Sequence, residues 1–259
     1  MNPRIIEVFA ESPADQVLAL KFSQEFKIPL APADLDKIQA PLLLVISDGK
    51  VGFKLIREPK APVYFPEFSS ATTQFKIEDE LKRRGKLLKA IEGKFSTKPS
   101  LRVFDAFGGF AQDGFLLACA GHDVLNMEKN PLVHLVTKAA WDSQNEEAWI
   151  LEKNVNLSLS EGDSFEFLSG TQEFFDVIYW DPMFEKLKSK SKSALPMQIL
   201  QSLLNQKESA PLDFDWALRL SLQRAPKVVM KLPIKGPPLV KKSPSHQIPG
   251  KTIRYDVFI

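Results

Sequence analysis

The sequence is poor in cysteine and histidine, and this scarcity excludes several kinds of site. Cys119 is the only cysteine, so no disulfide can form within the chain. The three histidines (His122, His134 and His246) are scattered, and no Cys/His group has the spacing of zinc ligands. We therefore expect neither a disulfide scaffold nor a bound metal.

Long apolar runs are also missing. The run at residues 42–46, for example, is far too short to cross a bilayer. The N-terminus carries Arg4 and Glu7 and lacks the apolar core of a signal peptide. We expect a cytoplasmic protein that has no membrane contact and is a monomer. Its 259 residues suffice for one large domain, or for a core domain with a smaller appendage.

Charge is distributed unevenly along the chain, although the net charge is only +2. Residues 101–181 contain 4 Lys/Arg and 14 Asp/Glu, whereas residues 182–259 contain 14 Lys/Arg and 5 Asp/Glu. Such asymmetry suggests that one face binds a polyanion. Uneven use of lysine on an ordinary solvated surface is the alternative explanation.

The first hundred residues combine short strands with one basic helix. Strands are expected at residues 5–9, 42–46 and 51–56, and Asp48-Gly49 between the last two favours a β-hairpin. Apolar residues at helical spacing predict a helix over residues 77–92, interleaved with lysines and arginines. We expect a small β-rich α+β subdomain over residues 1–75 and a basic helical connector over residues 76–100.

From residue 101 the pattern changes to alternating strands and helices. Strands are expected at residues 101–105, 122–128, 155–159, 176–180 and 227–232, with residues 254–259 as an edge strand. Helices are expected at residues 113–120, 132–141, 164–168, 194–205 and 213–223. This alternation predicts a Rossmann-like α/β domain over residues 101–259 with a mostly parallel, doubly wound sheet. Ligands of such sheets bind beyond the carboxyl ends of the strands.

The first of these strands ends in Asp105 and runs into a glycine-containing turn. Gly109 can adopt unusual backbone angles and lets a ligand approach the main chain. The full G-x-G-x-x-G fingerprint for a pyrophosphate is absent, which argues against an NAD-dependent oxidoreductase. The turn suits a nucleoside ligand, although a purely structural turn would explain it about as well.

Glu128 ends the next strand, 23 residues after Asp105. An acidic residue at this place in a nucleotide-binding fold holds a ribose diol. A solvated glutamate at the end of a strand is the alternative. Further along, Asp163 and Ser164 are candidates for binding an adenine, although Asp163 could also be the N-cap of the next helix.

The strand at residues 176–180 leads into Asp181-Pro182-Met183-Phe184, which is similar to the D/N-P-P-Y/F signature of amino-group methyltransferases. A carboxylate and a backbone carbonyl can accept the two N–H bonds of an exocyclic amine, which is a poor nucleophile. An aromatic face can stack on an extruded base. We therefore expect Asp181, Pro182 and Phe184 to act in catalysis, since a strand merely ended by proline explains less of the pattern.

Several segments in the same order resemble the RsmJ-type 16S ribosomal RNA (guanine-N2) methyltransferases. They are residues 105–113, 127–131, 181–184 with Lys192-Ser193-Ala194-Leu195, 228–233 with Pro237-Pro238-Leu239, and 254–257. The resemblance covers roughly residues 40–259. It implies S-adenosylmethionine as methyl donor and the N2 amine of a guanine in small-subunit rRNA as acceptor. It further implies cofactor contacts from Gln112 and Asp113, Glu128 and Lys129, Asp163 and Ser164, and Asp181.

The chain departs from the family pattern at three positions within these segments. Gln112 and Lys129 stand where arginine is usual, and Ala111 replaces the second glycine of the first turn. Lysines and arginines in two segments are expected to contact RNA phosphate: Lys82, Arg83, Arg84, Lys86, Lys186, Lys188, Lys190 and Lys192. Two alternatives remain open, namely N-methylation of another nucleic acid or a protein amide, and a degenerate RNA-binding module.

Overall fold

The computed structural model describes residues 6–32, 34, 37–58, 60–93, 99–182, 193–204 and 212–259. The chain folds into two compact units. The first comprises Met1–Glu67, Leu135–Ser143 and Glu185–Ser209, and the second comprises Phe68–His134, Gln144–Phe184 and Ala210–Ile259. Helix α5 (Pro131–Gln144) contributes residues to both.

The first unit contains a three-stranded sheet. Strand β1 (Ile6–Ala10) pairs in parallel with β2 (Leu42–Ser47), which forms an antiparallel hairpin with β3 (Lys50–Leu55). The hairpin is confirmed: Asp48 and Gly49 both have positive φ, 50° and 74°, as a tight two-residue turn requires. Helix α8 (Leu195–Leu204) contacts β3.

Helix α1 (Gln16–Phe26), which follows a single 3₁₀ turn at Pro13–Asp15, was not predicted from the sequence. Only Ala19 and Phe22 of this helix are buried, whereas Val17 and Leu20 are exposed. Its apolar residues therefore do not form one buried stripe, which is the signal that sequence reasoning requires.

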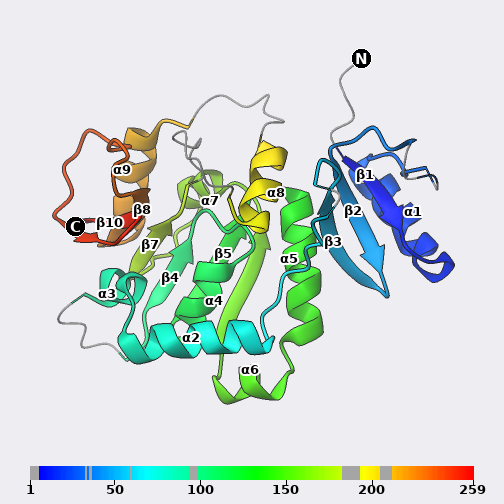
Figure 1. Ribbon diagram of the computed structural model, residues 1–259. Coiled ribbons are helices and arrows are strands. Elements are labelled where there is room, and N and C mark those ends of the chain that lie inside the picture. Colours follow the sequence, from blue (N-terminus) through cyan, green and yellow to red (C-terminus); the bar gives the residue numbers. More distant parts are fainter. Residues whose placement is uncertain are drawn as a thin grey trace. The chain divides into compact units, whose positions relative to one another are not determined.

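The second unit is built on a seven-stranded sheet in the order β6-β5-β4-β7-β8-β10-β9 (Figure 1). The first five strands of this order are parallel, and β10 and β9 add an antiparallel hairpin. The strands are β4 (Arg102–Asp105), β5 (Asp123–Glu128), β6 (Asn156–Glu161), β7 (Val177–Trp180), β8 (Val228–Pro233), β9 (His246–Pro249) and β10 (Ile253–Phe258). The predicted Rossmann-like α/β fold is confirmed.

Helices pack on both faces of this sheet. Helix α4 contacts β5 and β6, while α9 contacts β8 and also packs against α7. The helices are α2 (Ala71–Arg83), α3 (Lys86–Glu92), α4 (Gln112–Cys119), α6 (Ala148–Glu152), α7 (Ser164–Gly170) and α9 (Phe214–Arg224). All four residues of β7 are buried, as expected for a central parallel strand covered on both sides. Within the described ranges, no helix has the length and apolarity to span a bilayer.

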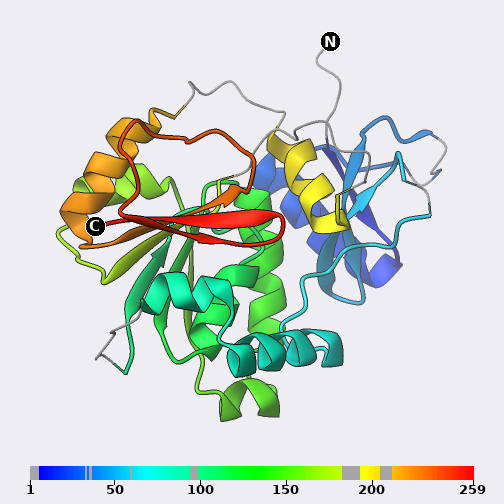
Figure 2. The same ribbon diagram turned by 60° about the vertical axis from the view of Figure 1, so that its left-hand side comes forward.

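Two predictions about secondary structure were wrong. The C-terminal strand β10 is not an edge strand, because β9 pairs with its outer side (Figure 2). The helix expected over residues 77–92 is two helices, α2 and α3. Arg84 adopts a left-handed conformation with φ 46° that ends α2, and Gly85 is the non-helical N-cap that precedes α3. Glycine has a low helix propensity, and the chain turns there.

Strand order also locates the site. From β4 the chain proceeds to β5 and β6 on one side of the sheet, and β7 and β8 lie on the other side. The carboxyl ends of β4 and β7 therefore flank a topological switch point, where α/β sheets bind their ligands.

Candidate active site

Alternation along the strands decides which side chains face the site. Neighbouring residues of a strand point to opposite faces of the sheet. Phe104, Met127, Ile178, Trp180 and Met230 belong to the apolar core formed with residues of α7 and α9. The polar residues that alternate with them share the opposite face, that of α4: Asp105, Asn126, Glu128, Tyr179, Asp181 and Lys231.

The pairing register of adjacent strands places these residues side by side in a row across the sheet. Asp105 lies opposite Asn126 of β5 on one side and opposite Tyr179 of β7 on the other. Lys231 of β8 lies opposite Tyr255 of β10. Side chains in directly opposed positions of adjacent strands are neighbours. The polar row therefore crosses five strands near the switch point.

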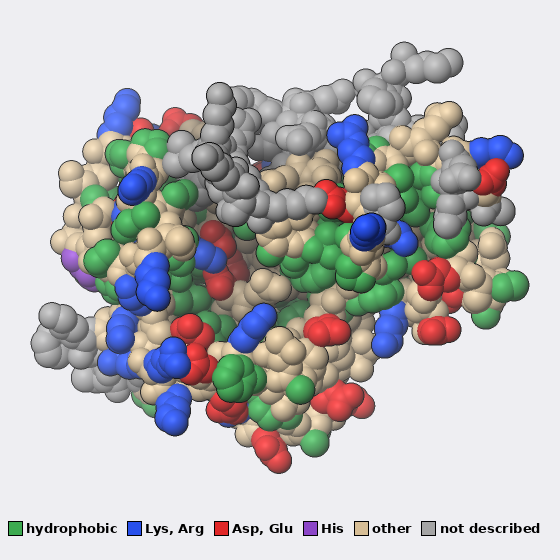
Figure 3. Space-filling model, in the orientation of Figure 1, with side chains coloured by type: hydrophobic (Ala, Val, Ile, Leu, Met, Phe, Trp, Pro, Cys, Tyr) green, Lys and Arg blue, Asp and Glu red, His purple; other side chains and the backbone are tan. Residues whose placement is uncertain are grey.

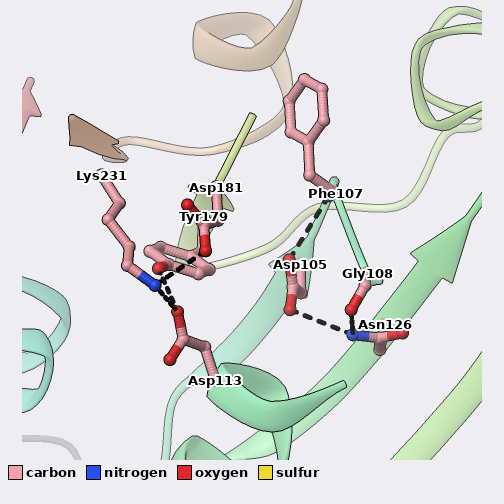
Figure 4. A network of polar contacts seen from close by, with 8 residues as sticks. All are labelled: Asp105, Phe107, Gly108, Asp113, Asn126, Tyr179, Asp181 and Lys231. Atoms are coloured by element: carbon pink, nitrogen blue, oxygen red, sulfur yellow. Dashed lines mark hydrogen bonds and ion pairs between the residues drawn. The ribbon is translucent and has the colours of Figure 1, made fainter. Parts of the chain in front are cut away.

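Lys231 is the centre of an ion-pair network (Figure 4). Its Nζ lies 2.7 Å from Oδ2 of Asp113 and 2.7 Å from Oδ2 of Asp181. The hydroxyl of Tyr179 donates a hydrogen bond of 2.6 Å to the same Oδ2 of Asp113. The network therefore links the first turn of α4 to the carboxyl end of β7 through a residue of β8.

The charges of this network perturb one another. Burial raises the pKa of Asp181 to about 6, and the charge of Asp113 adds to this effect while Lys231 opposes it. Burial alone would lower the pKa of Lys231, but the charges of Asp113 and Asp181 together raise it well above its usual value. Lys231 therefore stays protonated at any physiological pH.

Asp105 is the most deeply buried carboxyl group of the site, with 2% exposure. It accepts a hydrogen bond of 3.0 Å from Nδ2 of Asn126 and one of 3.3 Å from the backbone N–H of Phe107. Burial, followed by the charge of Asp113, raises its pKa to about 8. Asn126 also donates to the carbonyl oxygen of Gly108 at 3.3 Å, so it connects Asp105 to the turn that follows β4.

The turn after β4 is packed closely against β5. The N–H of Gly108 donates to the carbonyl oxygen of Met127 at 2.9 Å. A Cβ on Gly108 would meet Asn126 and would lie 2.8 Å from the carbonyl oxygen of Met127. Gly109 and Ala111 have positive φ, 51° and 55°. Glycine is thus needed at 108 for space, and the chain tolerates alanine at 111 in a conformation that favours glycine.

We expect Gly108→Ala to lower the free energy of unfolding by about 1–3 kcal/mol, because the added methyl group overpacks the turn against β5. Urea unfolding followed by circular dichroism measures the difference. Gly170→Ala is the matched control, since a Cβ there has no atom within 4 Å. Equal stability of the two variants would contradict this account of the turn.

Glu128 holds the same turn from the end of β5. Its Oε2 accepts a hydrogen bond of 2.7 Å from the N–H of Gly109, and its Oε1 accepts one of 2.6 Å from the N–H of Asn130. Burial raises the pKa of Glu128, while these backbone N–H groups oppose the increase. The backbone N–H of Lys129 also acts on this carboxylate, whose two oxygens have four lone pairs in all and so retain room for a further donor.

Asp163 is the N-cap of α7, which is one of the two roles that the sequence predicted for it. Its Oδ1 accepts hydrogen bonds from the N–H groups of Phe165 and Glu166, at 2.9 and 3.2 Å. Its Oδ2 pairs with Nζ of Lys129 at 2.6 Å, which joins the ends of β5 and β6. Ser164 is buried, whereas Gln112, the first residue of α4, is exposed.

The structure thus brings most of the predicted residues to one edge of the sheet. Asp105, Asp113 and Asp181 lie around one network, and Gly109 and Glu128 lie in and beside the adjoining turn. Phe184 lies outside the described residues. Pro182, the last described residue before it, is buried. Sequence reasoning missed Lys231, Tyr179 and Asn126. The sequence offers a signal for two of them, because Lys231 and Asn126 each stand inside an otherwise apolar strand.

The chain is similar to known methyltransferases over most of its length. The family described as SAM-dependent methyltransferase matches residues 27–259. The ribosomal RNA small subunit methyltransferase J of Thioalkalivibrio sulfidiphilus is 31% identical over 241 residues, which cover 91% of this chain and 90% of that protein. The protein of the same name from Francisella tularensis subsp. holarctica is 32% identical over 195 residues, which cover 75% of this chain and 79% of that protein.

A solved structure shows the same fold. A SAM-dependent methyltransferase from Neisseria gonorrhoeae has a TM-score of 0.67 and 21% identity, covering 98% of this chain and 95% of that one. The family match extends over nearly the whole chain, and its cofactor is S-adenosylmethionine. The chain therefore belongs to the SAM-dependent methyltransferase family, among the relatives named ribosomal RNA small subunit methyltransferase J.

Proposed function

We propose that this enzyme transfers a methyl group from S-adenosylmethionine to the exocyclic N2 amine of a guanine in the 16S rRNA of the small ribosomal subunit. The observation that carries the proposal is the placement of Asp181-Pro182 at the switch point, where Lys231 pairs with the carboxylate. The names of the relatives support small-subunit rRNA as the acceptor.

The residues of the site fit the cofactor. Four carboxyl groups, those of Asp105, Asp113, Glu128 and Asp181, lie at the strand ends and the first turn of α4, and Lys231 is the cation among them. This acidic surplus suits a ligand that carries an ammonium and a sulfonium charge. The free lone pairs of Glu128 suit the two hydroxyl groups of a ribose. We assign cofactor binding to Asp105, Gly109, Gln112, Asp113, Glu128, Lys129, Asp163, Ser164 and Asp181.

The mechanism needs orientation more than it needs a strong base. S-adenosylmethionine supplies a methyl group that its sulfonium already activates. The Asp181 carboxylate and the Pro182 carbonyl accept the two N–H bonds of the amine and direct its nitrogen. Formation of the N–C bond at the expense of the cofactor's C–S bond would make the amine acidic, and Asp181 or water would then accept the proton that it loses. Phe184 is proposed to stack on the base.

A basic surface offers a site for the RNA backbone. The sequence between Val228 and Tyr255 contains no Asp or Glu. Its exposed lysines Lys235, Lys241 and Lys251 form no ion pair within the part of the chain that the structure describes. In contrast, Arg83 and Arg84 of the predicted basic helix pair with Asp79 and Glu92. Lys and Arg side chains gather over α3 and the C-terminal strands (Figure 3).

Arg254 supports the part of this basic surface that surrounds Lys235. The guanidinium of Arg254 donates to the carbonyl oxygens of Pro233 and Gly236 at 2.6 and 3.0 Å, and it pairs with Asp256 at 2.9 Å. Arg254 thus fixes the chain at residues 233–236, on both sides of Lys235. A preorganised cationic segment loses little conformational entropy when it binds phosphate.

Replacing Lys235 and Lys241 by glutamate should weaken rRNA binding about tenfold or more at physiological salt, because each phosphate contact contributes to counterion release. The slope of log affinity against log salt concentration should fall by about one unit per lysine. Filter binding over a salt series measures both quantities. Lys21→Glu with Lys50→Glu in the first unit is the control of equal charge. An equal loss of rRNA affinity in both double variants would refute the proposal that this surface binds RNA.

The proposed function is tested with methyl-labelled S-adenosylmethionine. Protein-free 16S rRNA, small ribosomal subunits, double-stranded DNA and total ribosomal protein are offered as acceptors, and the labelled nucleoside is identified by mass spectrometry. N2-methylguanosine from rRNA or subunits is the expected product. Label in DNA or protein, or in another nucleoside, would overturn the acceptor assignment, and an absence of label with tight cofactor binding would favour a degenerate module.

A further inference from the structure

Lys231 carries a charge inside an otherwise apolar strand. Its neighbours Met230 and Leu232 are buried, and the lysine side chain itself is 22% exposed. Moving an ammonium group out of water costs free energy unless opposite charges compensate for it. Both compensating charges are carboxylates of the site, and both use the same nitrogen, at 2.7 Å each.

No other cation faces Asp181 among the described residues. The remaining titratable groups around it are Asp113 of α4, Asp105 of β4, Tyr179 of β7 and Tyr255 of β10, with Glu80 of α2 acting on Tyr255. All of these are acidic or neutral. Without Lys231, Asp113 and Asp181 would face each other uncompensated, and like charges favour the protonated form of one of them.

We propose that Lys231 is a positioning residue for methyl transfer, whose ammonium group fixes the Asp181 carboxylate beside Pro182 and keeps it charged. The proposal rests on the proposed function of Asp181. A charged carboxylate accepts an N–H bond of the acceptor amine, whereas a protonated carboxyl group also carries an O–H donor that competes. Lys231 itself does not accept the proton, because its pKa is raised by both carboxylates once the effect of burial is overcome.

The charge effect is measured first in the cofactor-free protein. Aspartate labelled with ¹³C at the side-chain carboxyl reports each titration by NMR, and Asp181→Asn assigns the signal. In Lys231→Met the titration midpoint of Asp181 should rise by about one to three pH units, because an opposite charge in contact is lost. Lys231→Arg should restore the midpoint. Asp113→Asn should shift it in the opposite direction, downward, and this variant remains informative if Lys231→Met does not fold.

Activity is measured next, as kcat against pH with rRNA and cofactor at saturation. In Lys231→Met the acidic limb should move to higher pH by the same amount. A rise of two units from about 6 would lower kcat about tenfold at pH 7 and restore it by about pH 9. A folded Lys231→Met with an unchanged Asp181 midpoint, or a kcat lowered equally at every pH, would overturn the proposal. If the wild type does not methylate rRNA, the proposed function fails, while the NMR titration still decides what Lys231 does to Asp181.

Discussion

Asp181→Ala should lower kcat for methyl transfer about 100- to 1,000-fold, because the acceptor amine loses the charged group that orients it. The variant keeps the Lys231–Asp113 pair and the contacts of Glu128 with the turn, so cofactor affinity should be retained at least in part. Single-turnover transfer of labelled methyl to rRNA measures the chemical step, and calorimetry with S-adenosylmethionine measures binding.

The control for this experiment is Asp123→Ala. Asp123 is a partly exposed carboxylate at the amino end of β5, on the opposite edge of the same sheet. The Asp123→Ala substitution should leave both the rate of methyl transfer and the affinity for S-adenosylmethionine unchanged. A fully active Asp181→Ala would show that the amine is oriented elsewhere, and the catalytic assignment would then be wrong.

Much of the sheet could be predicted because its signals are local. The strands β4, β5, β7 and β8 are short apolar runs bounded by polar or turn residues, and the predicted ranges agree with them within a residue or two. The position of β10 could not be found in this way. It depends on pairing with β9, whose own residues are mostly exposed and have no apolar pattern.

The same division holds for the site. Asp105, Glu128 and Asp181 could be predicted because each follows its strand in sequence, where the ligands of a parallel sheet gather. The role of Lys231 can be inferred only from its contacts with α4 and with the end of β7. Asn126 likewise depends on its register with Asp105. Side-chain partners from distant segments are not encoded in any local pattern.

Glu128→Ala should weaken S-adenosylmethionine binding about 100-fold, a loss of roughly 2.7 kcal/mol, since hydrogen bonds to charged groups contribute about 1.5–3 kcal/mol each. The variant also removes the acceptor of the Gly109 and Asn130 N–H groups, so the turn loses support as well. Glu128→Gln separates the two effects, because it keeps one carbonyl acceptor without the charge. We expect intermediate affinity from it.

Glu161→Ala is the matched control for this measurement. Glu161 ends β6 directly opposite Glu128 and is exposed, so it shares the strand end but makes no contact with the turn in the described structure. Calorimetry on wild type and the three variants at one pH gives the comparison. Weakened binding in both Glu128 variants but not in Glu161→Ala would mean that the carboxylate of Glu128 holds the cofactor. Unchanged affinity in Glu128→Ala would mean that the cofactor occupies another part of the strand ends, and the assignments around the first turn would then be withdrawn.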